Sequence, residues 1–257
     1  MVNEELIKKI IQKKEFSELP LRDVEKIFEK FNKSSYLDEE KIKLTRDLLR
    51  KVYSVYTSRK LFSFKNKDEE WFLKKHLSTK ERFPYYLEIY SRILKNTSRK
   101  LTILDLGSGV NGFSYLFFKK IGKDVKYIGI EAIKQIVEIQ NSYFKNKKYN
   151  AQVIHKSLFD LNKIQDILKI ENPPRIVLLF KVLDSLEMVE RDYSKRLLNK
   201  ISEFSELIVV SFATKSLISK KPFKIKRYWF YDFLKDKFKI LDEFEKGNEK
   251  YLVLSKK

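Results

Sequence analysis

The sequence predicts an α/β fold: a Rossmann-like sheet of seven strands, the last pair a hairpin, preceded by an N-terminal helical bundle. Three observations support this prediction. Apolar residues within positions 1–95 recur at spacings of three and four, which places them on one face of a helix. From Leu101 onward, short apolar runs alternate with helical patterns, as in parallel sheets. The last two apolar runs are joined by Lys-Gly-Asn at 246–248 with no helix between them.

Four amphipathic segments predict the helices of the N-terminal part. They cover Glu4–Lys14, a segment that starts at Pro20, Asp38–Ser58, and Phe83–Leu94. Short links between them suit a small bundle. We therefore expect a helical domain over residues 1–95 and a sheet domain over residues 96–257.

Five strand–helix units followed by a hairpin are expected in the second domain. Strands are predicted at Leu101–Leu106, Val125–Glu131, Ala151–His155, Arg175–Lys181, Glu206–Phe212, Phe238–Glu243 and Tyr251–Leu254. Helices are predicted at Phe113–Ile121, Ile133–Phe144, Leu161–Ile170, Ser185–Ile201 and Trp229–Lys237.

The composition excludes several classes of protein. The chain has no cysteine and two histidines, so we expect no disulfide, no thiolate chemistry and no metal. No apolar run approaches the ~20 residues that span a bilayer. The mixed-charge N-terminal segment lacks the apolar core of a signal peptide. We expect a cytoplasmic monomer that does not contact a membrane.

The net charge of +20 favours a polyanionic partner. Two basic segments, Lys41–Lys60 and Lys215–Arg227, are interleaved with aromatic residues, and such a combination suits phosphates and unpaired bases. The alternative is a solvated, lysine-rich surface. If the partner is RNA, the residues that we expect to bind it are Lys51, Arg59, Lys60, Lys220 and Lys221.

The loop after the first predicted strand carries an acid and two glycines: Asp105, Gly107 and Gly109. Only Gly-x-Gly is present, so the three-glycine dinucleotide fingerprint does not fit. An acid followed by Gly-x-Gly resembles the first motif of class I S-adenosylmethionine (SAM) methyltransferases. There, Asp105 would orient the loop and the glycines would make room for the cofactor. The alternative is a tight strand–helix turn without a ligand.

The other predicted strands end in further candidate residues. Glu131 ends the second strand, where an acid suits the ribose hydroxyls of a nucleotide-like ligand, although an ordinary exposed glutamate is the alternative. Ser157 and Leu158 follow the third strand and would face an adenine. Phe180 and Lys181 end the fourth strand. Two acids are expected to cap helices instead, Asp160 at the third strand and Asp184 in a capping box with Glu187.

The stretch His76–Pro84 has two readings that can both hold. Arg82 and Thr79 can bind a carboxylate. Alternatively, Ser78 caps a helix start with Glu81 three residues on.

These motifs together resemble the 16S rRNA guanine-N(7) methyltransferases of the aminoglycoside-resistance type. His76–Pro84 is similar to that family's His-x-Ser-Thr-x-Glu-Arg-Leu-Pro motif, and Asp105–Asn111 to its Asp-Leu-Gly/Ala-x-Gly-x-Asn loop. Leu178–Glu187 and Ser211–Leu217 resemble two further family segments, in the same order. The departures are Phe83 for Leu, Ala213 for Pro, Glu131 for Asp, and Ser157 for an adenine-facing acid. Ile218–Arg227 replaces a glycine-rich segment near the target base.

The resemblance implies SAM-dependent methylation of a guanine N(7) in the decoding region of 16S rRNA, within the 30S subunit, and with it aminoglycoside resistance. No general base is expected, because this nitrogen keeps a free lone pair at neutral pH. Implied cofactor contacts are His76, Thr79, Arg82, Asp105, Gly107, Gly109, Glu131, Ser157 and Leu158. Implied target-base positions are Phe180, Lys181, Ser211 and Lys215.

Two alternatives remain open at this point. The same fold can methylate another RNA site, such as a tRNA or an adenine N(1). A non-catalytic RNA-binding or ribosome-assembly factor can keep the fold without the activity.

Overall fold

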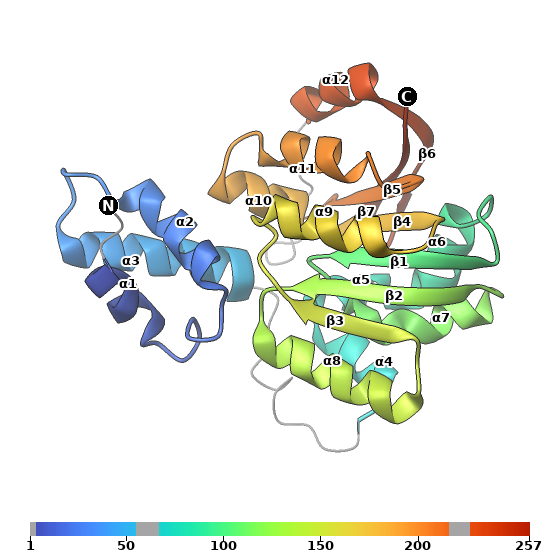
Figure 1. Ribbon diagram of the computed structural model, residues 1–257, viewed down its shortest axis with the longest axis horizontal. Helices are drawn as coiled ribbons and strands as arrows, with labels where there is room; N and C mark the ends of the chain where they lie inside the picture. Colours follow the sequence, from blue (N-terminus) through green and yellow to red (C-terminus); the bar gives the residue numbers. More distant parts are fainter. Residues whose placement is uncertain (1–3, 55–66, 216–226) are drawn as a thin grey trace.

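A seven-stranded sheet forms the centre of the computed structural model, which describes residues 4–54, 67–215 and 227–257 (Figure 1). Its strands are β1 (Lys100–Leu106), β2 (Asp124–Glu131), β3 (Ala151–His155), β4 (Arg175–Phe180), β5 (Leu207–Ala213), β6 (Phe238–Lys246) and β7 (Glu249–Lys256). They are arranged in the order β3-β2-β1-β4-β5-β7-β6, and β7 runs antiparallel to both of its neighbours. The predicted fold class and its terminal hairpin are confirmed.

Helices cover both faces of the sheet, which is why its inner strands are almost continuously apolar. On one face, α9 (Leu161–Ile170), α10 (Leu183–Val189), α11 (Tyr193–Ile201) and α12 (Tyr228–Lys237) pack with residues such as Leu104 and Leu106. On the other face, α7 (Tyr115–Lys120) and α8 (Lys134–Lys147) pack with Leu101 and Ile103. Alternate side chains of β1 thus belong to opposite cores.

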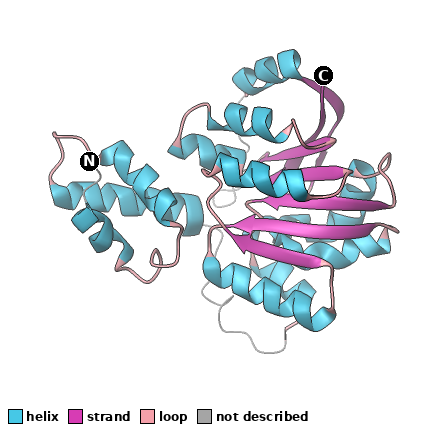
Figure 2. Ribbon diagram, in the orientation of Figure 1, coloured by secondary structure: helices cyan, strands magenta, loops and turns pink. Residues whose placement is uncertain are grey.

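The N-terminal bundle consists of α1 (Glu4–Ile11), α2 (Leu21–Phe31), α3 (Asp38–Leu49) and the π-helical turn η1 (Arg50–Ser54). Its buried apolar residues, Ile10, Ile27 and Leu49 among them, join the same core cluster as α9 to α12. In Figure 2 the arrowheads of β1, β2 and β3 point toward this bundle. The bundle therefore lies at the carboxyl edge of the parallel strands.

The helices of residues 69–93 pack differently from this bundle. They are α4 (Glu69–Lys75), α5 (Leu77–Arg82), the 3-10 turn η3 (Phe83–Tyr85) and α6 (Tyr86–Ile93). Phe72, Leu73, Tyr86 and Ile89 lie in the core on the α7–α8 face of the sheet. Whether residues 1–95 act as one domain stays a prediction, but the packing groups α4 to α6 with the sheet.

Two helix predictions need correction. The helix expected at 113–121 starts as a 3-10 turn, η4 (Asn111–Ser114), and continues as α7. The helix expected at 185–201 is split into α10 and α11 by Asp192, whose φ is 61°.

The predicted helix caps have mixed outcomes. Asp160 caps α9 and accepts a hydrogen bond from the Lys163 N–H at 3.4 Å, as expected. The capping box at Asp184 is wrong: its carboxylate pairs with Arg227, while Glu187 accepts from the backbone N–H groups of Asp192 and Ser194. Glu187 therefore stabilises the start of the following helix instead of its own.

In the described ranges, no helix is both long enough and apolar enough to cross a membrane.

Candidate ligand pocket at the carboxyl edge of the sheet

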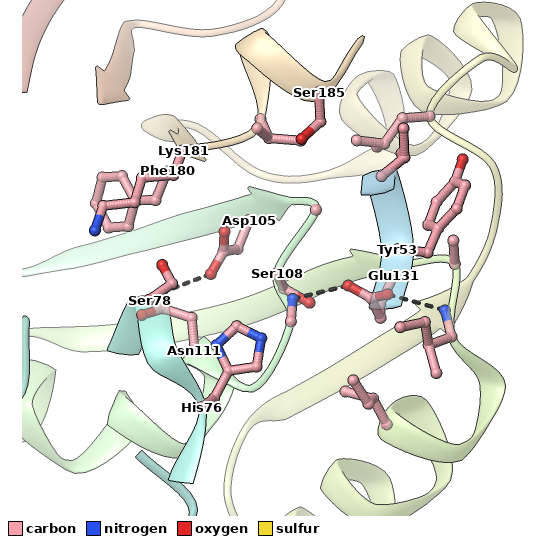
Figure 3. Close-up of a pocket in the computed structure, with 18 of the residues that line it drawn as sticks. Tyr53, His76, Ser78, Asp105, Ser108, Asn111, Glu131, Phe180, Lys181 and Ser185 are labelled. Carbon is pink, nitrogen blue, oxygen red and sulfur yellow. Dashed lines mark hydrogen bonds between the residues drawn. The ribbon is translucent and has the colours of Figure 1, made fainter. Parts of the chain in front are cut away.

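A cavity of about 120 Å³ lies where the parallel strands end, between the sheet and the N-terminal bundle (Figure 3). Ligands of open α/β sheets bind at this edge. The strand ends contribute Asp105, Gly107, Ser108, Gly109, Asn111, Glu131, Leu158, Phe180 and Lys181 to its wall. Helix α5 and its N-cap contribute His76, Ser78, Thr79 and Arg82. The bundle contributes Asp23, Val52 and Tyr53.

The loop after β1 is held in shape by the buried carboxylate of Asp105. Its Oδ2 accepts hydrogen bonds from Asn111 Nδ2 and from the Tyr127 hydroxyl, both at 2.7 Å. Burial raises the pKa of Asp105 above its ordinary value, although both hydrogen bonds favour the charged form. The geometry thus agrees with a loop-orienting role for Asp105.

Both glycines of the loop adopt left-handed conformations, with φ of 73° at Gly107 and 51° at Gly109. A Cβ at position 107 would lie 2.7 Å from Val182 Cγ2. A Cβ at position 109 would lie 3.5 Å from the His76 ring. The missing side chain of Gly107 therefore lets the loop pass close to Val182, whereas a Cβ at position 109 would make an ordinary van der Waals contact and only the left-handed backbone favours glycine there.

Glu131 lies in the pocket wall and is buried, so it is not an ordinary surface glutamate. Its Oε2 accepts from the Gly109 N–H at 2.8 Å, and its Oε1 accepts from the Ile133 N–H at 2.9 Å (Figure 3). Burial raises the pKa of Glu131, whereas these backbone hydrogen bonds act in the opposite direction. Its contact with a ribose stays a prediction.

The segment His76–Pro84 builds one side of the pocket, and its predicted helix cap is wrong. His76, not Ser78, is the N-cap of α5, and no side chain caps this helix. Glu81 pairs with Lys181 instead, at 2.8 Å. The Thr79 hydroxyl donates to the carbonyls of Leu73 in α4 and of His76, the N-cap of α5. Its proton is therefore used in the link between these two helices.

Arg82 is 1% exposed and lies at the centre of a buried polar network. Its Nη2 donates to both carboxylate oxygens of Glu249, at 2.8 and 3.1 Å. Its Nη1 donates to Asn111 Oδ1 at 2.9 Å, and its Nε donates to the Tyr251 hydroxyl at 3.2 Å. Most donors of the guanidinium are therefore used within the protein, and its contact with a ligand carboxylate stays a prediction.

The surroundings of His76 favour its neutral form. Burial, together with the positive charges of Arg82 and Lys181, lowers the pKa of His76 to about 3. A neutral imidazole can pack against a ligand without adding charge.

The four predicted target-base residues fall into different environments. Phe180 and Lys181 line the pocket, and the Arg82 guanidinium lies 4.4 Å from the Phe180 ring centre. Ser211 is fully buried, donates to Glu249 and accepts from the Lys181 N–H, and its contact with the target base stays a prediction. Lys215 is exposed two residues after the end of β5.

Of the two residues expected to face an adenine, only Leu158 lines the pocket among the described residues. Ser157 is buried outside the pocket wall: its hydroxyl donates to Asp23 and accepts from the Phe159 N–H at 3.0 Å. Its hydroxyl is thus used within the protein, and its direct contact with a base stays a prediction.

Of the predicted RNA-binding residues, Lys51 is among the residues that the structure describes. Lys51 is exposed on η1. Arg59, Lys60, Lys220 and Lys221 lie outside the described residues.

Five polar residues used in describing the site were missed from the sequence: Asp23, Tyr53, Ser108, Asn111 and Glu249. A signal existed for Asp23, which precedes Ile27 by one helical turn and so places an acid on the apolar face of α2. A signal also existed for Asn111, which ends the glycine-loop motif. No local pattern marks Glu249, because its partner Arg82 is 167 residues away.

This arrangement defines a class: Rossmann-like α/β proteins with a ligand pocket at the carboxyl edge, a glycine loop after β1 and a buried acid after β2. Residues 68–229 match the sequence profile of the family described as "Ribosomal RNA methyltransferase (FmrO)". Because this match spans more than half of the chain, the chain belongs to the ribosomal RNA methyltransferase (FmrO) family.

Similar proteins agree with this assignment. The 16S rRNA (guanine(1405)-N(7))-methyltransferase of Proteus mirabilis is 25% identical over 187 residues, which cover 70% of this chain and 63% of that protein. The structure of the 16S rRNA methylase RmtB has a TM-score of 0.76 at 18% identity, with all of both chains covered. The 16S rRNA methyltransferase RmtF, solved in complex with S-adenosyl-L-homocysteine, has a TM-score of 0.78 at 18% identity and covers 99% of this chain and 98% of its own.

The solved structures and the curated relatives support different conclusions. At 18% identity the two solved structures show the fold. The chain spans between 48% and 63% of the length of the curated relatives it matches.

Proposed function

We propose that the protein is a SAM-dependent methyltransferase that modifies N(7) of a guanine in the decoding region of 16S rRNA, within the assembled 30S subunit. The observation that carries this proposal is positional. The family match over residues 68–229 includes the glycine loop, Glu131, Phe180 and Lys181, and every other lining residue of the pocket except Asp23, Val52 and Tyr53. The relative from Proteus mirabilis is named for this reaction, and RmtF was solved with the demethylated form of SAM.

The pocket residues fit SAM. Each Glu131 oxygen accepts one backbone N–H, and a carboxylate oxygen has lone pairs left for ribose hydroxyls. Ser108 Oγ is buried in the same wall and has no hydrogen-bond partner among the described residues, so it is available to a ligand. Gly109 faces the His76 ring with no side chain between them, and both residues line the pocket. Thr79 and Arg82 line the same pocket and are the candidates to hold the methionine carboxylate.

Bound SAM would supply a methyl group on a positively charged sulfur. The lone pair of guanine N(7) forms the new bond, the bond between the methyl group and sulfur breaks, and its electron pair stays on sulfur. No proton leaves this nitrogen, so the chain needs no general base. Its task is to hold the two reacting atoms in line.

Phe180 and Lys181 suit the side of the pocket that receives the base. Phe180 lines the pocket and is fixed edge-on against Tyr251, with ring centres 5.6 Å apart, while Arg82 lies over its ring; we propose that its surface in the pocket packs against the base. The Lys181 ammonium is neutralised by Glu81 at 2.8 Å and Glu249 at 3.4 Å. Because the product base is cationic, paired charge on Lys181 and a neutral His76 avoid repulsion.

The target base has to leave its stack to enter an enclosed pocket. Docking on RNA would use the excess positive charge through Lys51, Arg59, Lys60, Lys220, Lys221 and Lys215. A 30S substrate would place this activity in the cytoplasm, and we propose that the protein works as a monomer.

The reaction can be tested with purified protein, SAM, and either 30S subunits or naked 16S rRNA. Borohydride and aniline cleave RNA at N(7)-methylguanine, so primer extension should stop at one new position in the decoding region of the 30S sample. A modified tRNA beside an unmodified 30S subunit would overturn the substrate assignment. Binding of the protein to RNA without any affinity for SAM would favour a non-catalytic factor.

A matched pair of variants tests the cofactor site. Glu131→Ala should weaken SAM binding by about 10- to 100-fold, because hydrogen bonds to a charged group contribute ~1.5–3 kcal/mol. Glu138→Ala removes an exposed acid of α8 and should leave the affinity unchanged. Calorimetry on both variants measures this, and equal affinities would contradict the role of Glu131.

A further inference from the structure

Asp23 is a buried acid of the N-terminal bundle that reaches the pocket. It lies in the first turn of α2, is 1% exposed and lines the cavity. Its Oδ1 accepts a hydrogen bond from the Ser157 hydroxyl. Its Oδ2 is buried and has no hydrogen-bond partner in the part of the chain that the structure describes. Ser157 therefore holds Oδ1, and the Tyr53 hydroxyl is a second polar neighbour of this carboxylate. A carboxylate oxygen can accept more than one hydrogen bond, so Oδ2 still has room for a donor that a ligand brings.

A buried carboxylate oxygen without a donor is unfavourable, since water no longer solvates it. Burial raises the pKa of Asp23 to about 6, while the neighbouring Tyr53 and Ser157 hydroxyls and the charges of His155 and Arg22 favour its ionised form. A donor that arrives with a ligand would relieve this cost.

The position of Asp23 relative to Glu131 identifies the part of the ligand that it can meet. Glu131 pairs with His155 in the register of β2 and β3, and the Lys156 N–H donates to the Glu131 carbonyl at 3.1 Å. Ser157, which holds Asp23, is the next residue. Asp23 thus lies on the β3 side of Glu131, and a ribose held at Glu131 has its base as the neighbouring group.

The wall around this position suits a flat purine ring. Its apolar residues are Val52, Ala132, Ile133, Ile136, Leu158 and Leu186. Tyr53 adds an aromatic ring near Glu131 (Figure 3). Apolar faces with one acceptor at the edge match adenine, whose exocyclic amine is a donor.

We propose that Asp23 accepts a hydrogen bond from the exocyclic amine of the adenine of SAM, so that the N-terminal bundle completes the cofactor site. This inference rests on the proposed function. Ser157 is then a positioning residue: it fixes Oδ1 and leaves Oδ2 directed to the base. The β3 loop carries no acid of its own at position 157, and the bundle supplies one.

The bundle is well placed for this role, because side chains of α2 bind to α10 and to Glu190, the residue that follows α10. Lys26 pairs with Glu190 at 2.6 Å, and the Lys30 ammonium donates to the Met188 carbonyl. Binding of the cofactor and seating of the bundle are therefore coupled.

The test compares the affinities for two ligands by calorimetry. S-adenosylhomocysteine carries the amine, and S-inosylhomocysteine carries an oxo group at the same carbon. The wild-type protein should prefer the amine by about 10- to 100-fold, because the Asp23 carboxylate would face an oxygen in the second ligand.

Asp23→Asn gives a specific expectation. The Asn oxygen should stay on the Ser157 hydroxyl, so the amide NH₂ turns to the base. Affinity for S-adenosylhomocysteine should fall about 10- to 100-fold, while that for S-inosylhomocysteine should not fall. Glu29→Gln removes an exposed acid from the same helix and should keep the wild-type preference.

The outcomes separate this inference from the proposed function. Equal affinity of the wild-type protein for the two ligands, or an unchanged preference in Asp23→Asn, would overturn the role of Asp23 and leave the function standing. No binding of S-adenosylhomocysteine by the wild-type protein would overturn both. The wild-type comparison needs no variant, so it decides the matter even if Asp23→Asn does not fold.

Discussion

Arg82 joins the last strand of the sheet to the wall of the pocket. Its partner Glu249 is fully buried and also lies 3.4 Å from the Lys181 ammonium. The charges of Arg82 and Lys181 keep the pKa of Glu249 below its ordinary value despite burial. A side chain that the sequence offered as a ligand contact is thus also part of the core.

Arg82→Ala should therefore destabilise the protein as well as weaken any ligand contact. Removing one partner of a buried ion pair costs about 3–5 kcal/mol in the free energy of unfolding, and Lys181 and Ser211 should keep the loss near the lower end. Urea denaturation measures the loss. Arg92→Ala breaks a half-exposed pair with Asp242 and should cost at most about 1 kcal/mol. Similar losses for the two variants would contradict this account.

Asp23 makes stability depend on pH with a definite sign. Its pKa is about 6 in the folded protein, above the ordinary value of 3.8. Below pH 3.8 the carboxyl is protonated in both states. As the pH rises through 6, the unfolded chain is already ionised, so this group's contribution to stability is lost.

Asp23→Asn should thus be more stable than the wild type at about pH 7.5, by on the order of 2 kcal/mol, and the difference should shrink toward about pH 4. Urea denaturation across this range in the absence of ligand provides the measurement. A difference that stays constant with pH would mean that Asp23 is not forced to ionise while buried. A variant that gains stability but loses the preference for adenine would mark Asp23 as a residue kept for binding.

At the scale of the element, the loop after β1 combines left-handed glycines with close packing. Gly107 and Gly122 have nearly the same φ, 73° and 76°. A Cβ at 107 would meet Val182, whereas a Cβ at 122 would have no heavy atom within 4 Å. A comparison of substitutions at these two positions therefore distinguishes the cost of backbone strain, which both share, from the cost of a steric clash, which only position 107 has.

Gly107→Ala should lose more stability than Gly122→Ala, and it alone should weaken SAM binding. Gly122→Ala carries only the strain of a left-handed alanine, about 1–2 kcal/mol. Gly107→Ala adds a 2.7 Å contact that must displace Val182 or the loop, and both line the pocket. Thermal unfolding and calorimetry test the pair. Equal effects of the two changes on affinity would show that the loop tolerates a side chain there.

At the scale of the whole molecule, the excess charge and the position of the bundle predict how the protein binds RNA. Residues 1–100 carry 25 basic and 16 acidic side chains, and the remainder of the +20 charge lies beyond them. Because the bundle also lines the pocket, a base in the pocket and RNA on the bundle would be bound by neighbouring surfaces.

Reversal of Lys51, Arg59 and Lys60 to Glu should abolish methylation of 30S subunits while leaving SAM affinity intact. Phosphate contacts release counterions, so wild-type activity should fall steeply with salt. Reversal of three exposed lysines on α12 and β6, Lys235, Lys237 and Lys239, is the control and should have little effect. Primer extension reads the product. Methylation that survives the first triple reversal would contradict this docking face.

The fold was predictable because its signals are local. Runs such as Leu101–Leu106 and the helical spacing of α9 report burial within a few residues, and the strand–helix alternation then leaves few arrangements. The same logic placed Asp105, Gly107, Gly109 and Glu131 together, since strands that run in parallel end at one edge.

Other features were decided by tertiary structure alone. Arg82 with Glu249 and Ser157 with Asp23 join residues 167 and 134 positions apart, and neither pair follows from periodicity or spacing. The position of the bundle at the carboxyl edge likewise depends on packing between its apolar residues and those of α9 to α12, which come together only in the folded chain. Local sequence determines which face of each element is apolar, whereas long-range packing determines which polar groups are buried with it. That packing brings Asp23 to the pocket.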